Sequence, residues 1–155
     1  MQNKQSYTVA EAQQKLEHYC SYQERCHQEV VNKLNSLGMY ISARELILTH
    51  LIQENFLNET RFAQSFARGK FRIKKWGRNR IKKELKARQI SENNIRLGLK
   101  EISEEDYQST FWALFEKRKA AVQGVSSTLQ KKKIMNYMIY RGWETHVIYE
   151  PLNNL

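Results

Sequence analysis

A segment near the middle of the chain concentrates positive charge. Residues 68–88, RGKFRIKKWGRNRIKKELKAR, hold 11 lysines and arginines and one acid, Glu84. Like charges in such number repel one another in the folded state unless an anion meets them. The chemistry that these residues can perform is therefore the binding of an anion. The candidate partners are a nucleic-acid backbone and an acidic protein groove.

The rest of the chain carries no net charge. The whole protein has a formal net charge of +10. Outside residues 68–88 the 15 basic residues are balanced by 15 acidic ones, so the entire excess belongs to this one segment. The candidate anion-binding residues are Arg61, Arg68, Lys70, Arg72, Lys74, Lys75, Arg78, Arg80, Lys82, Lys83, Lys86 and Arg88.

Three of these cations have helical spacing. Arg78, Lys82 and Lys86 follow one another at intervals of four residues and therefore share one face of a helix. We expect reversal of these three charges to abolish partner binding and to leave the helix intact. A shorter run, residues 131–133, lies near the predicted start of another helix, where cations are unfavourable, and could be a second contact, although such runs are more often solvated.

Apolar residues are interleaved with the cations. Four of them are spaced to face a core: Phe66, Ile73, Ile81 and Leu85. Two aromatic residues, Phe71 and Trp76, could stack on a nucleic-acid base or cover the core. We favour the core for both rings, because basic residues and core aromatics alternate in many helical proteins.

No pattern of catalytic or metal-binding residues stands out. Asp106 is the only Asp, and neither a Gly-rich phosphate loop nor a nucleophile elbow occurs. Two Cys and two His fall close together, but their spacing fits no common zinc site: His18, Cys20, Cys26 and His27. We expect no enzyme activity, no metal, no cofactor and no disulfide scaffold.

The elements that must position the basic segment are helices. Apolar residues recur at intervals of three and four, and one Pro and six Gly leave little room for long loops. We predict nine helices and no strand, with approximate spans 8–19, 22–37, 43–55, 59–75, 78–88, 92–101, 104–122, 127–141 and 145–152. Predicted N-caps are Thr8, Ser21 and Ser42, each with a Glu three residues later, and Asn58, Ser91 and Ser103.

A sequence pattern occurs three times at a period of 51 to 53 residues. The segments are VVNKLNSLGM (residues 30–39), IKKELKARQI (81–90) and IMNYMIYRGW (134–143). Each has an apolar residue, another four later, a helix-ending position after four more, and then an apolar residue. Gly38 and Gly142 at that position favour the left-handed conformation that ends helices.

The repetition predicts the architecture. We expect an all-α protein, an elongated and curved array of three tandem three-helix, helix-turn-helix-like repeats. The predicted units are residues 1–57, residues 58–102, which carry the charge, and residues 103–155. A DNA-reading helix-turn-helix module is the alternative, although the basic helix has mainly Asn79 as a base-reading side chain.

The stretch from Phe56 to Ile90 resembles the RecX family. The matching features are Arg61-Phe62-Ala63, Gly77, Arg80-Ile81 and Glu84-Leu85. Two positions depart from the family pattern. Asn58-Glu59 replaces an acidic pair, and Gln89 replaces a Gly, which predicts a helix end that is less sharply left-handed. The resemblance covers about residues 20–155 and leaves the role of the first 20 open.

The resemblance implies a regulator of the RecA recombinase. Proteins of this family are expected to bind along the groove of the RecA filament on single-stranded DNA and to modulate, usually inhibit, its ATPase and strand exchange in DNA repair, recombination and the SOS response. The expected partners are the RecA filament and possible contacts to single-stranded or duplex DNA phosphates. Because no apolar run approaches about 20 residues, we expect a cytoplasmic location without membrane contact. We also expect a monomer.

Overall fold

The structure is a computed structural model and describes residues 6–155. Over this range it contains nine α-helices, one π-helical turn and no strand. The elements are α1 (Val9–Tyr22), α2 (His27–Ser36), α3 (Ile41–Gln53), α4 (Glu59–Gly69), the π-helical turn η1 (Lys70–Lys74), α5 (Arg78–Ala87), α6 (Glu92–Leu99), α7 (Glu104–Ala121), α8 (Ser127–Tyr140) and α9 (Thr145–Asn153).

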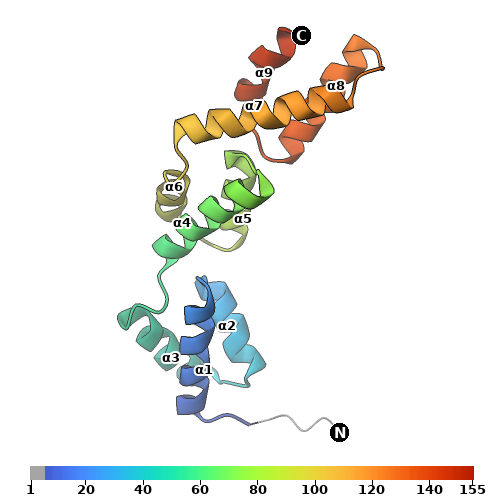
Figure 1. Cartoon of the computed structure of the whole chain (residues 1–155). Coiled ribbons are helices and arrows are strands. Elements are labelled where there is room, and N and C mark those ends of the chain that lie inside the picture. Colours follow the sequence, from blue (N-terminus) through green and yellow to red (C-terminus); the bar gives the residue numbers. More distant parts are fainter. Residues whose placement is uncertain (1–5) are drawn as a thin grey trace, which may run out of the picture.

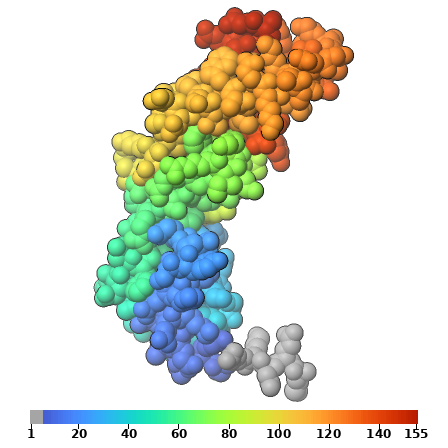
Figure 2. All heavy atoms as spheres, in the orientation of Figure 1, coloured from blue at the N-terminus to red at the C-terminus, as the bar shows by residue number. Residues whose placement is uncertain are grey.

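The helices form a row of three groups. Helices α1–α3 pack together at one end, α4–α6 in the middle and α7–α9 at the other end (Figure 1). The body is elongated and curved (Figure 2). The prediction of an all-α, curved array of three three-helix repeats is confirmed. Residues 1–5 of the predicted first unit lie outside the described residues.

The threefold sequence pattern corresponds to one backbone motif. Helices α2, α5 and α8 each end in a left-handed residue, at Gly38, Gln89 and Gly142. The next residue, Met39, Ile90 or Trp143, is buried, and its amide donates to the carbonyl five residues earlier at 3.0 to 3.1 Å. This is the Schellman motif. The weaker left-handed turn predicted at Gln89 is wrong, because its φ is +59°.

Four predicted N-caps are confirmed and two are wrong. Thr8, Asn58, Ser91 and Ser103 each accept a hydrogen bond from the amide three residues on. Ser21 instead lies inside α1, with its hydroxyl donating to the Glu17 carbonyl, and Ser42 lies inside α3. Helix α2 begins later than predicted, because the Cys26 amide is capped by the Glu29 carboxylate.

Buried side chains form two clusters. One lies within the first unit, and the other extends through the second and third units and also takes in Cys26 of the first unit. Ile81 and Leu85 are buried as predicted, whereas Ile73 is 78% exposed. The reason is η1, because a π-helical turn inserts a residue into the helical register and rotates the following side chains. Phe71 is buried and Trp76 is half-buried against the core, as predicted.

The second and third units are joined through their backbones. The amides of Gly77 and Asn79, at the start of α5, donate to the carbonyls of Arg141 and Gly142, both at 2.9 Å. Amides at a helix start and carbonyls at a helix end have no partners within their own helices, so each end satisfies the other. The positive end of one helix dipole also meets the negative end of the other.

The first and second units are joined mainly by side chains. The Arg61 guanidinium pairs with Glu24 at 2.6 Å and also donates to the carbonyls of Asn55 and Phe56 at 3.0 and 3.3 Å. On the same side of the junction, the His27 amide donates to the Glu59 carboxylate at 3.3 Å. Arg61 therefore stabilises the turn between α3 and α4.

Candidate anion-binding site

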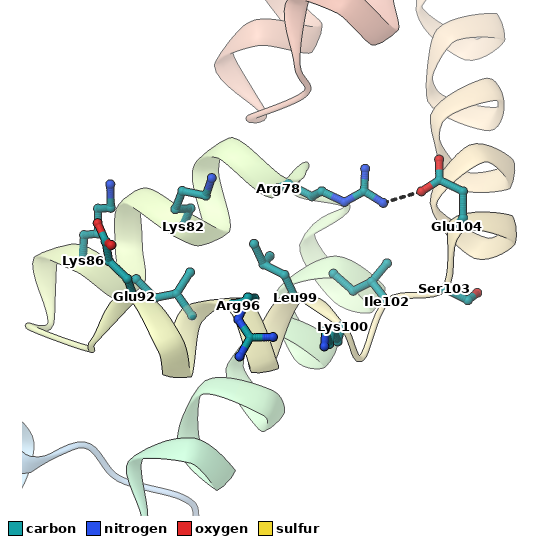
Figure 3. A pocket seen from close by; sticks show the side chains of 11 residues that line it. Arg78, Lys82, Lys86, Glu92, Arg96, Leu99, Lys100, Ile102, Ser103 and Glu104 are labelled. Atoms are coloured by element: carbon teal, nitrogen blue, oxygen red, sulfur yellow. Dashed lines mark hydrogen bonds and ion pairs between the residues drawn. The ribbon is translucent and has the colours of Figure 1, made fainter.

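A groove of about 770 Å³ lies between α5 and α6. Cations from both helices line it, with Glu92 and Glu104 at its ends and apolar side chains between the two rows (Figure 3). The cations are Arg78, Lys82 and Lys86 of α5 and Arg96 and Lys100 of α6, and the apolar residues are Ile95, Leu99 and Ile102. We call this the α5/α6 groove.

Close packing positions α6. A side chain at Gly98 would meet the backbone of Ala63 at 2.7 Å, so the absence of one lets α6 lie directly on α4. The Thr60 hydroxyl also donates to the Asn94 amide oxygen at 2.7 Å. These contacts fix the helix that carries Arg96 and Lys100, and with it one wall of the groove.

Four of the five cations in the groove are available to a partner. Lys82, Lys86, Arg96 and Lys100 are exposed, and none of them forms an ion pair with a carboxylate of residues 6–155. Two parallel rows of cations above an apolar floor suit a ligand that is both anionic and partly apolar. Such a ligand would meet opposite charge at the rims and would bury apolar surface at the floor.

Arg78 is engaged within the protein. Its guanidinium pairs with Glu104 at 2.6 Å and Glu144 at 3.3 Å and lies 3.7 Å from the centre of the Tyr107 ring. Burial opposes its charge, but hydrogen bonding to Glu104 and the fields of Tyr107 and Glu144 outweigh this and raise the pKa of Arg78. A glutamate at position 78 would face the carboxylates of Glu104 and Glu144. Replacement of Arg78 by glutamate should therefore destabilise the fold, contrary to the expectation that reversing this charge leaves the helix intact.

Tyr107 completes this network below Arg78. Its hydroxyl donates to Glu144 and accepts from the Arg78 amide at 3.0 Å. Burial, followed by the hydrogen bond to Glu144, raises the pKa of Tyr107. The phenol therefore stays protonated and serves as a structural link between α5, α7 and the start of α9.

Several other predicted site residues also have partners in the chain. Arg61, Arg68 and Arg88 pair with Glu24, Glu101 and Glu84. Arg80 donates to the Tyr140 carbonyl at 3.3 Å, and the half-buried Lys70 lies over the Phe66 and Trp76 rings. The remaining predicted cations are exposed and unpaired with any described carboxylate: Arg72, Lys74, Lys75, Lys82, Lys83 and Lys86.

The basic segment is therefore divided between surfaces. On α5, Lys82 and Lys86 face the groove, whereas Arg80 and Arg88 lie on the other side of the buried stripe, toward the Trp76 and Phe66 rings. Arg96 and Lys100 complete the groove and were missed from the sequence. Their spacing of four residues on a predicted helix was the available signal.

The two cysteines are buried and free. Within residues 6–155 no group of three or more His, Cys, Asp and Glu is arranged to hold a metal ion. Burial raises the pKa of the Cys20 thiol and of the Cys26 thiol to about 11, from an ordinary value of 9.0. These residues behave as small apolar side chains of the two cores.

The thiol pKa values predict a pH dependence. At pH 8 an aromatic disulfide reagent should react slowly with Cys20 and Cys26 in the native protein and rapidly in denaturant, because the thiolate is the reacting form. The native rate should rise about tenfold per pH unit toward pH 11. Because the thiol pKa is higher in the folded than in the unfolded protein, the folded state gains stability from the protonated thiols. This gain is fully present below pH 9 and is lost as the pH rises through 11. Rapid native reaction at pH 8 would contradict their burial.

Comparison with known proteins points to one family. A model described as "RecX, second three-helix domain" matches residues 58–99, which include the two helices on either side of the groove, α5 and α6. The chain is 27% identical over 137 residues to "Regulatory protein RecX" of Bacillus cytotoxicus, and 32% identical over 89 residues to that of Lactobacillus johnsonii. Residues 58–99 thus match a RecX domain, and most of the chain is similar to RecX proteins.

Solved RecX structures share the fold. The crystal structure of RecX from Lactobacillus salivarius matches with a TM-score of 0.81 and 23% identity, covering 95% of this chain and 97% of that one. A second crystal structure, described as regulatory protein RecX, has a TM-score of 0.80 and 21% identity, covering 95% and 75%. The RecX fold therefore includes most of the first 20 residues, which the sequence resemblance left out.

The match to the curated relatives is partial in length. The aligned regions cover 88% and 57% of this chain, but 51% of the Bacillus cytotoxicus protein and 33% of the Lactobacillus johnsonii protein. The chain thus spans about half the length, or less, of the curated relatives it matches. Both relatives carry the name of a regulatory protein. No helix within residues 6–155 is long and apolar enough to cross a bilayer.

Proposed function

We propose that this chain regulates the RecA recombinase by binding to its filament on single-stranded DNA. The observation that carries the proposal is the α5/α6 groove. Most of its lining lies within residues 58–99, which match the family model, and it places four unpaired cations around an apolar floor. The proposed ligand of the groove is an acidic, partly apolar segment exposed along the filament.

Shape supports the same partner. The three units form a curved body that is long relative to its width (Figure 2). Such a body can contact more than one protomer of a filament, because a row of stacked units offers an extended surface. By bridging protomers, a small protein can alter filament assembly or nucleotide turnover. We propose that it lowers both.

The direct test is RecA-dependent ATP hydrolysis on single-stranded DNA with the purified chain added. We expect the rate to fall with a saturable dependence on the amount of added protein. An unchanged rate at saturating amounts would overturn the proposal. Sequence-preferring binding to duplex DNA without RecA would instead favour the alternative, a helix-turn-helix nucleic-acid-binding regulator.

A further inference from the structure

A second surface lies on the other side of α5 from the groove. Tyr140, the last residue of α8, is 76% exposed. The Arg80 guanidinium carbon lies 5.0 Å from the centre of its ring and 4.3 Å from that of Trp76. Because Arg80 also donates to the Tyr140 carbonyl, both residues are held in place. We call Tyr140, Arg80 and Trp76 the Tyr140 platform.

Cations surround the Tyr140 platform. Arg141 follows Tyr140 directly and donates to the Lys74 carbonyl at 2.8 Å, and the Trp143 indole donates to the Lys75 carbonyl at 3.2 Å. The end of α8 therefore lies against residues 74–75, whose two lysine side chains are exposed. None of Lys74, Lys75, Arg80 and Arg141 pairs with a carboxylate of the described residues.

An exposed tyrosine ring next to unpaired cations suits one class of ligand. A ring that is fixed by an arginine offers a stacking surface at little cost in side-chain entropy. Nearby ammonium and guanidinium groups attract phosphates. Single-stranded nucleic acid combines an accessible base face with a phosphate backbone, whereas the bases of a duplex are already stacked on one another.

We propose that the Tyr140 platform binds single-stranded nucleic acid directly, with one unpaired base stacked on the Tyr140 ring. Lys74, Lys75 and Arg141 contact the flanking phosphates. The Arg80 guanidinium lies over the ring, 5.0 Å from its centre, and holds it in position. This binding requires no RecA and is independent of the α5/α6 groove.

The test measures binding of a fluorescently labelled oligothymidine by anisotropy, at fixed salt and without RecA. Stacking of one base on an aromatic side chain is worth roughly tenfold or more in affinity, so Tyr140→Ala should weaken binding by about that factor. Tyr140→Phe should bind like the native protein, because it keeps the ring. The matched control is Tyr149→Ala, which removes a tyrosine that is 59% exposed on α9 and should leave affinity unchanged.

An abasic oligomer of the same length separates stacking from charge. It keeps the phosphates and lacks the bases, so the native protein and the Tyr140→Ala variant should bind it equally. Equal affinity of the two proteins for oligothymidine would overturn the proposal, as would an equal loss on both oligomers. Either result can be obtained whatever the outcome of the ATPase experiment with RecA.

Discussion

Replacement of Lys82, Lys86, Arg96 and Lys100 by glutamate is expected to abolish the effect of the chain on RecA-dependent ATP hydrolysis. The four side chains line the α5/α6 groove, are exposed and have no carboxylate partner among the described residues. Reversal of their charge turns attraction for an acidic ligand into repulsion, which costs several kcal/mol at an interface. Helical content measured by circular dichroism should be unchanged, because no internal ion pair is lost.

The control for this variant has the same net charge. Lys117, Lys131, Lys132 and Lys133 lie in the third unit, on α7 and α8, away from the groove. Their replacement by glutamate should leave inhibition of the ATPase in place. Equal loss in the two variants would mean that overall charge, and no particular surface, governs binding. Full activity of the groove variant would move the interface elsewhere.

Gly142→Ala is expected to destabilise the fold strongly, although it adds only one methyl group. Gly142 has a φ of +94°, which costs an L-residue about 1–2 kcal/mol. An added methyl group would also lie 2.3 Å from the Arg80 Cβ, at the junction of α8 and α5. Overpacking of this kind adds about 1–3 kcal/mol. The free energy of unfolding, measured with urea, should therefore fall by roughly 2–5 kcal/mol.

Gly38→Ala separates the two causes. Gly38 occupies the same position of the Schellman motif in the first unit, with a φ of +74°, but nothing lies within 4 Å of an added Cβ. Its replacement should cost only the conformational strain. A loss of stability at position 142 no larger than that at position 38 would show that the close approach of α8 to α5 contributes little.

The repeated part of the fold was predictable from local patterns. The Schellman turns at Gly38 and Gly142 depend on a glycine and on apolar residues nearby in sequence, so one sequence suffices to find them. The caps at Ser21 and Ser42 were mispredicted, because capping boxes also match by chance inside helices. The exposure of Ile73 could not be foreseen, since a π-helical turn has no clear sequence signal.

The site was less predictable than the fold. The charge of residues 68–88 pointed to α5, and Lys82 and Lys86 on this helix line a groove. The ion pairs of the arginines could not be predicted, however. Arg61 pairs with Glu24 and Arg78 with Glu144, and the two members of each pair lie 37 and 66 positions apart in the chain. Such pairs depend on how the units pack, which periodicity within one helix does not encode.

The two junctions between units differ, and this makes the array unevenly stiff. Helices α5 and α8 are joined by backbone hydrogen bonds and share a core, so the second and third units should tilt and unfold as one body. The first unit has its own core and is held to the second by the Arg61–Glu24 pair, a few neighbouring contacts and Cys26, which is buried in the core of the other two units. We therefore expect bending to be concentrated near residues 54–58, where a small rotation would change the curvature of the whole molecule.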